Sequence, residues 1–249
     1  MTVKPAIVLS HGAFHAPKHY NLLFDALKDR GFEVHCPQLP SVGSTHSGFE
    51  ADVAIVSNTI ESLVAKDKDV ILMCHSYGGF VGSAAASPYI KRAGASGHGI
   101  VAMIYMCAFL PAKGQTLADL GEDAGAKGWA APNDQGQIAV FPEKAQYAFY
   151  NDVTDQKLVN ETVAGLKGQA IASFMGVADA EPWREVRSVY ILCELDNAIY
   201  LHEQQKMAGR GGMLEQVTLK SGHSPWMSDL QNLIKIVTTV AEGKPLEQI

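Results

Sequence analysis

The chain has 249 residues and a net charge of −6, with 20 lysine and arginine residues against 26 aspartate and glutamate residues. Hydrophobic residues make up 47% and charged residues 18%, which is enough for a large buried core and argues against disorder. A mildly acidic chain without basic clusters is not expected to bind nucleic acid. No apolar run approaches the ~20 residues that cross a bilayer, so no membrane partner is expected either.

Apolar runs alternate with helical patterns along the chain. Strand-like runs bounded by turn residues occur at 6–10, 32–36, 70–74, 100–106, 189–193 and 214–219. Most are apolar throughout, which is typical of parallel strands covered on both faces. Helical spacing occurs in 21–31, 52–65 and 226–237, and Ser224-Pro225 is expected to begin the last of these helices. This alternation predicts an α/β fold with a doubly wound, mostly parallel six-stranded sheet.

One segment interrupts the alternation. Residues 112–183 are too long for a simple crossover, and their patterns predict helices and a short hairpin. We therefore expect a core of residues 1–111 and 184–249, with a mainly helical cap of residues 112–183 inserted after the fourth strand. The cap carries most of the mid-chain aromatic residues, so we expect it to form a lid that selects substrates by shape.

The four cysteines lie in or at the ends of strand-like runs, at Cys36, Cys74, Cys107 and Cys193. Free cysteines behave as small buried hydrophobes, and this spacing resembles neither a CxxC metal site nor a disulfide framework. The N-terminal residues contain only a short apolar run and are expected to form a strand rather than a signal peptide. We therefore expect reduced thiols in a cytoplasmic protein.

The stretch ILMCHSYGGFVG, residues 71–82, carries the strongest chemical signal. It is similar to the Gly-x-Ser-x-Gly turn that presents a nucleophilic serine, except that Cys74 stands in place of the first glycine. Cysteine is small enough for a turn at which strand and helix approach closely, and Gly78-Gly79 keeps the face of the following helix thin. Ser76 is therefore predicted to be a nucleophile rather than a helix-capping serine.

Further reactive groups follow other strands of the predicted sheet. Ligands of open parallel sheets bind outside the carboxyl ends of the strands. Ser76, Asp196 and His223 follow the third, fifth and sixth strands, which is the chain order of a serine-hydrolase triad. His223 would accept the serine proton, and Asp196 would orient the imidazole and stabilise its cation. The backbone N–H groups of Ala13 and Tyr77 would bind the oxyanion.

Two alternative interpretations are weaker. Glu194 competes with Asp196 as the orienting acid, but it directly follows the strand and by alternation points away from the site. The glycines after Ser76 suggest a dinucleotide-binding loop, but position 77 is tyrosine, and no acidic residue that could bind a ribose occurs between Asp69 and Asp119. No cofactor is expected.

A histidine cluster near the N-terminus invites a metal-site interpretation. His11, His15 and His19 are spaced by four residues, as ligands on one helix face would be. Gly12 and Pro17 interrupt any helix there, and His11 belongs to the loop that is expected to bind the oxyanion. No metal site is expected.

Taken with their positions, these motifs resemble the α/β-hydrolase superfamily. They are HGAFH after the first strand, HSYGG after the third, an aspartate beyond the fifth and GHS before the last helix. Within it, the chain is similar to the compact branch of plant methylesterases, hydroxynitrile lyases and their microbial relatives. Hydroxynitrile lyases of that branch carry a threonine where this chain has Gly12 and a lysine where it has Ser224. The resemblance therefore favours ester hydrolysis over cyanohydrin cleavage.

The expected function is a serine hydrolase whose small-molecule partner is a small or medium lipophilic carboxylic ester or lactone. Gly12, Phe14, Trp129 and Phe149 are expected to contact this substrate, because a pocket between cap and sheet needs apolar walls. A lyase or C–C bond-cleaving enzyme on the same fold stays open as an alternative, as does a receptor that retains the triad without turnover. A homodimer is also left open.

Overall fold

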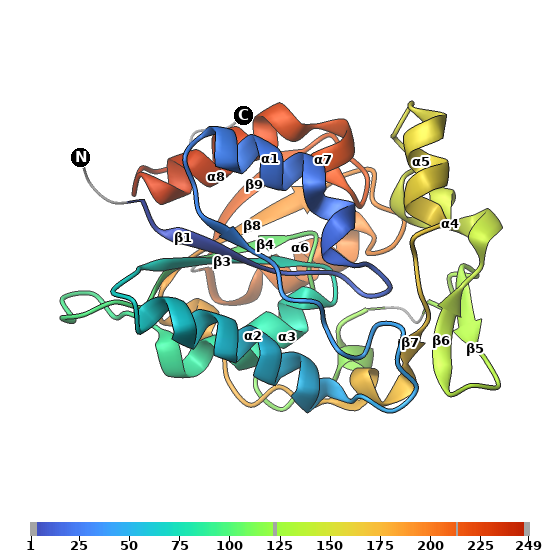
Figure 1. Cartoon of the computed structure of the whole chain (residues 1–249), viewed down its shortest axis with the longest axis horizontal. Helices are drawn as coiled ribbons and strands as arrows, with labels where there is room; N and C mark the ends of the chain where they lie inside the picture. Colours follow the sequence, from blue (N-terminus) through green and yellow to red (C-terminus); the bar gives the residue numbers. More distant parts are fainter. Residues whose placement is uncertain (1–3, 122–123, 213, 247–249) are drawn as a thin grey trace.

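The computed structural model describes residues 4–121, 124–212 and 214–246. Six strands form one parallel sheet in the order β2-β1-β3-β4-β8-β9 (Figure 1). They are β1 (Ala6–Ser10), β2 (Val34–His35), β3 (Val70–His75), β4 (Ile100–Met106), β8 (Arg187–Cys193) and β9 (Glu215–Leu219). The predicted six-stranded parallel sheet is confirmed. Only β2 is much shorter than the run 32–36, and it lies at the sheet edge, where it pairs with β1 alone.

Helices cover both faces of this sheet (Figure 1). One face carries α1 (Asn21–Asp29), α7 (Pro225–Ser228) and α8 (Leu230–Ala241), and the other carries α2 (Phe49–Val64), α3 (Gly78–Ala86) and α6 (Leu201–Ala208). Each face has its own apolar core, represented by Leu23 and Val237 on the first and by Val56 and Phe80 on the second. The sheet is therefore doubly wound.

The last predicted helix is divided in the structure. We expected one continuous helix from Ser224, but α7 ends at Ser228 and α8 begins at Leu230. The residue between them, Asp229, has a non-helical conformation with φ −138°, and its carboxylate accepts a hydrogen bond from the side chain of Asn232 at 3.0 Å.

The insertion between β4 and β8 lies beside the carboxyl ends of the parallel strands (Figure 1). Its regular elements are β5 (Ala130–Pro132), β6 (Gln137–Val140), α4 (Pro142–Phe149), α5 (Gln156–Val163) and β7 (Gln169–Ala170). The strands form an antiparallel sheet in the order β5-β6-β7, where we expected a single hairpin. Short 3₁₀ helices lie at Leu117–Asp119, Ile171–Met175 and Pro182–Arg184 within it, and at Pro17–Tyr20, Ser87–Tyr89 and Arg210–Gly212 elsewhere.

Strand register places the loops that matter for the site side by side. β1 and β3 pair without a shift from Ala6 opposite Val70 to Ser10 opposite Cys74, so both strands end at the same level. The loop after β1 therefore lies beside Ser76. None of the described helices is long and apolar enough to cross a membrane.

Candidate active site

Ser76 occupies a strained turn between β3 and α3. Its φ is +52°, a left-handed conformation that costs energy for a residue with a side chain and persists only where the surroundings hold it. Its carbonyl accepts hydrogen bonds from the N–H of Gly79 at 2.9 Å and from the N–H of Phe109 at 3.1 Å. This is the geometry of a nucleophile elbow, which exposes the serine hydroxyl at the end of a strand.

The structure explains why a cysteine is tolerated at position 74. A Cβ on Gly78 would lie 1.9 Å from the carbonyl oxygen of Ser10, so this turn needs glycine there. A Cβ on Gly82 would lie 2.5 Å from the Cys74 Sγ. The cysteine side chain therefore uses the space that a side chain at position 82 would take.

Asp196 and His223 meet at the carboxyl edge of the sheet. The His223 Nδ1 lies 2.8 Å from the Asp196 Oδ2, and both side chains are buried. The same carboxylate accepts the N–H groups of Ala198 at 2.7 Å and Ile199 at 2.9 Å, which hold it in place. Because the carboxylate accepts, Nδ1 of His223 carries the proton, which leaves Nε2 free to act as a base.

Glu194, the competing acid, is exposed, as strand alternation predicted. Ser76 Oγ and the His223 imidazole, both within the described chain, form no hydrogen bond with each other in this structure. Such contacts are often long in enzymes without substrate and tighten when it binds. The ring of Phe149 lies 5.6 Å from that of His223, centroid to centroid, and Phe149 lines the same cavity as Ser76. His223 itself does not line this cavity, and its ring packs against Phe149, which does.

Two backbone N–H groups beside Ser76 find no acceptor among the residues that the structure describes. Neither the Ala13 N–H nor the Tyr77 N–H donates to an acceptor within the described residues. Both residues line the cavity together with Ser76. Unpaired amides at this place are suited to bind a developing negative charge on a carbonyl oxygen.

The cavity has a volume of about 390 Å³, which is within the range of small-molecule sites. Among the expected substrate-contacting residues, Phe14, Trp129 and Phe149 line it. Their rings contact one another, with Trp129 edge-on to Phe149 at a centroid distance of 5.1 Å. No charged side chain of the described residues lines the cavity. The aromatic ring of Phe174 also lines it, and the sequence had not pointed to further apolar walls such as Phe109, Ile138 and Ile171.

Gly12 does not line the cavity, contrary to expectation. It packs against His75, because a Cβ at position 12 would lie 2.7 Å from the His75 Nδ1. Its N–H donates to the hydroxyl oxygen of Tyr20 at 2.9 Å, and that hydroxyl lies 2.7 Å from the same Nδ1. Glycine is needed at position 12 because any side chain there would collide with the imidazole of His75. No sequence pattern had pointed to Tyr20.

His75 extends these hydrogen bonds to His223. Its Nε2 lies 2.9 Å from the backbone carbonyl oxygen of His223. A carbonyl only accepts, so Nε2 carries a proton, and burial holds the pKa of His75 well below its ordinary value. The neutral ring therefore accepts from Tyr20 through Nδ1 and donates to His223 through Nε2.

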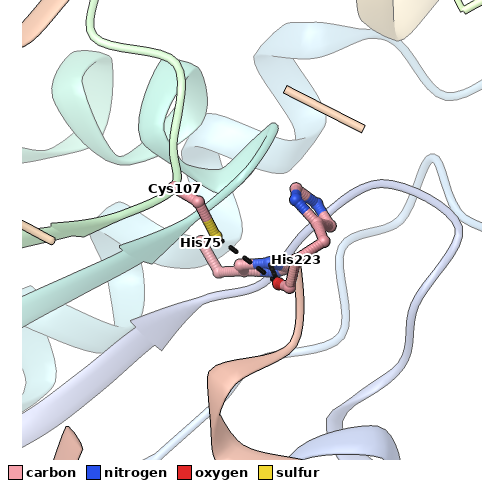
Figure 2. Close-up of side chains that lie close together, drawn as sticks. All are labelled: His75, Cys107 and His223. Atoms are coloured by element: carbon pink, nitrogen blue, oxygen red, sulfur yellow. Dashed lines mark hydrogen bonds between the residues drawn. The ribbon is translucent and has the colours of Figure 1, made fainter. Parts of the chain in front are cut away.

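One group of potential metal ligands occurs in the parts of the chain that the structure describes. Ligand atoms of His75, Cys107 and His223 lie within 4.8 Å of one another. Figure 2 shows the Cys107 thiol and the His75 imidazole at the carbonyl oxygen of His223, while the ring of His223 points away from that carbonyl. Burial raises the pKa of the Cys107 thiol, which disfavours the thiolate that a metal needs. These groups fit hydrogen bonding to His223 better than metal binding.

The N-terminal histidines also have hydrogen-bonded rings. Nε2 of His11 accepts the Leu39 N–H at 3.0 Å, and the ring of His15 contacts the Ala13 carbonyl at 2.6 Å and the Tyr150 hydroxyl at 2.8 Å. Burial lowers the pKa of both histidines, to about 4 for His11. Neutral rings with these contacts stabilise the loop after β1.

Comparison with known proteins identifies the class. The model of the alpha/beta hydrolase family matches residues 7–235, and the chain therefore belongs to this family. It is 28% identical over 250 residues to the alpha/beta hydrolase nvfD of Aspergillus novofumigatus, a match that covers 98% of this chain and 99% of that protein.

Solved structures share the fold. A pyrethroid hydrolase from Sphingobium faniae JZ-2 is 22% identical, with a TM-score of 0.76 and coverage of 97% of this chain and 98% of that one. A methylesterase from Arabidopsis is 19% identical, with a TM-score of 0.77 and coverage of 96% and 99%. The predicted resemblance to the α/β-hydrolase superfamily is confirmed by the family match, and these structures share its fold.

Proposed function

We propose that this protein is a serine hydrolase that cleaves a lipophilic carboxylic ester or lactone. The observation that carries the proposal is Ser76 itself, held at φ +52° on an apolar cavity beside the unpaired N–H groups of Ala13 and Tyr77. His223, oriented by its hydrogen bond to Asp196, is the base that a serine hydroxyl needs. The names of structural relatives, a pyrethroid hydrolase and a methylesterase, support the same class.

The reaction follows from these groups. Oγ of Ser76 attacks the ester carbonyl carbon while its proton passes to Nε2 of His223. The resulting oxyanion accepts from the N–H groups of Ala13 and Tyr77. Collapse of the tetrahedral intermediate breaks the bond to the alcohol oxygen, which takes the proton from His223. Water then attacks the acyl-enzyme by the same route, releasing the acid and restoring Ser76.

Ser76→Ala tests the proposal. We expect turnover of a simple activated ester to fall by about 10⁴- to 10⁶-fold, as in other triads without their nucleophile. A fluorophosphonate should label Ser76 in the unchanged protein. The matched control is Ser83→Ala, which removes a buried hydroxyl from α3 that does not line the cavity. Unchanged turnover in a folded Ser76→Ala protein, or labelling at another residue, would contradict the proposal.

A further inference from the structure

Gln169 connects the insertion to the loop after β1. It belongs to β7, and its side chain is fully buried. Its Oε1 accepts the backbone N–H of Phe14 at 3.0 Å, and its Nε2 donates to the Oγ of Ser173 at 3.0 Å. Gln169 does not line the cavity, so any effect on a substrate must pass through the residues that it holds.

The backbone amides of this loop are held on both sides of Ala13. The N–H of Gly12 donates to the Tyr20 hydroxyl, and the N–H of Phe14 donates to Gln169. The Ala13 N–H between them has no acceptor within the residues described here. Two fixed neighbours therefore determine the direction in which this amide can donate.

Phe14 needs to be held, because its φ is +66°. A non-glycine residue keeps such a conformation only where its surroundings determine it. Both hydrogen bonds of its backbone come from the insertion, since the N–H donates to Gln169 and the carbonyl accepts the Lys167 N–H at 3.0 Å. Without the glutamine oxygen, the Phe14 N–H would be buried and unpaired, which favours relaxation of the loop.

The same glutamine is linked through Ser173 to the side chain of Tyr77, the residue that carries the second proposed donor. Ser173 accepts from Gln169 at its Oγ, and its backbone carbonyl accepts the Tyr77 hydroxyl at 3.0 Å, a hydroxyl that Asp52 also accepts at 2.9 Å. The backbone N–H of Tyr77 is the other unpaired amide beside Ser76. One buried side chain of the insertion thus contacts the supports of both amides.

We propose that Gln169 is a positioning residue of the oxyanion hole: its amide group sets the directions of the Ala13 and Tyr77 N–H groups through Phe14 and Ser173. This inference rests on the proposed hydrolase function. A positioning role of this kind acts on the transition state, in which the oxyanion forms, and leaves ground-state binding in the cavity largely unchanged.

Gln169→Met tests this role, because methionine fills nearly the same volume and removes both hydrogen bonds. We expect kcat to fall about 10- to 100-fold, since a displacement of about 1 Å at a reacting group can cost about 10²-fold. KM should change by no more than about twofold. Affinity for a trifluoromethyl ketone, which forms a tetrahedral adduct with Ser76, should fall in parallel with kcat. Gln169→Glu, which keeps the acceptor for the Phe14 N–H, should recover most of the loss.

Gln137→Met is the matched control. Gln137 is a buried glutamine on the neighbouring strand β6, and it donates to the Ser44 carbonyl at 2.8 Å without a hydrogen bond to the oxyanion loop. We expect the kcat of this variant to equal that of the unchanged protein. Equal losses in Gln137→Met and Gln169→Met would overturn the inference, as would a change in KM alone.

Folding and the proposed function are controlled separately. If Gln169→Met does not fold, Gln169→Asn withdraws the amide by one methylene, and an unchanged kcat in that variant overturns the inference. Absence of fluorophosphonate labelling at Ser76 in the unchanged protein contradicts the hydrolase function itself. Labelled Ser76 together with unaffected Gln169 variants contradicts only the positioning role.

Discussion

The parallel sheet and the insertion contribute to the site in different ways. Ser76, Asp196 and His223 follow β3, β8 and β9, so all three groups that we propose to react come from the ends of neighbouring or nearby sheet strands. Their approximate places follow from strand order and register. The proposed oxyanion donors also lie in sheet loops outside the insertion.

The insertion instead provides walls and hydrogen bonds. Beyond Gln169, its Asp152 accepts the N–H of Gly222, directly before His223, at 2.6 Å. Its Asn151 donates to the Leu195 carbonyl, directly before Asp196, at 2.8 Å. A lid that only covered the site would not need these contacts. The insertion therefore supplies some of the hydrogen bonds that hold the reactive groups, and the core supplies others, such as those of His75 and Tyr20.

The largest effect should come from the sheet side. Asp196→Asn should lower kcat by about 10⁴-fold on every ester tested, because an amide favours the wrong tautomer of His223. Steady-state kinetics on a short and a bulky ester measure the loss. Glu194→Gln, two residues away and exposed, should leave activity nearly unchanged. Equal losses in the two variants would show that Asp196 does not orient the histidine.

A wall residue of the insertion should change selectivity more than rate. Trp129→Ala removes an aromatic wall of the cavity, and the ratio of kcat/KM for an aromatic acyl ester over the matching acetate should fall about tenfold or more. Phe141→Ala is the control, because Phe141 is an exposed aromatic of the insertion that does not line the cavity. An equal loss of kcat/KM on both esters in Trp129→Ala would show that this wall residue of the insertion does not determine substrate selectivity.

The last effect concerns the free energy of unfolding in acid rather than a rate, and it should depend on buried histidines of β3 and of the loop after β1. Burial lowers the pKa of His11 to about 4 and those of His15 and His75 well below the ordinary value near 6.5. The unfolded chain therefore binds protons more readily, and the stabilisation present above about pH 6.5 is lost as the pH falls toward 4. Each histidine should remove about 1.4 kcal/mol per pH unit within this window. The raised pKa of Asp52 acts in the opposite direction.

Urea unfolding at pH 7.0, 6.0 and 5.0, values chosen around the ordinary histidine pKa of about 6.5, measures this loss. His11→Gln, which keeps a donor and an acceptor, should reduce the dependence on pH by about one histidine's share. A stability that does not change between these pH values would contradict neutral, buried histidines in the folded state.

Much of the architecture could be predicted from local signals. Continuous apolar runs predicted the parallel strands, because a strand covered on both faces has no polar face. Strand ends then placed Ser76, Asp196 and His223 at one edge of the sheet, and alternation separated Asp196 from Glu194. The prediction went wrong at Gly12, which packs against the distant His75 instead of lining the cavity. It also missed the break of the last helix at Asp229 and the third strand of the insertion's sheet.

The sequence by itself determined the sheet, the elbow at Ser76 and the order of the three proposed catalytic residues. These features follow from the spacing of apolar residues, from small residues and from turn residues, which act within a few neighbouring positions. Tertiary structure alone decided which groups hold them. Gln169 and Phe14 are 155 residues apart, and their hydrogen bond exists only because the insertion packs against the loop after β1. A buried amide finds its partner in three dimensions, and no local pattern around a two-residue strand distinguishes Gln169 from any other polar residue.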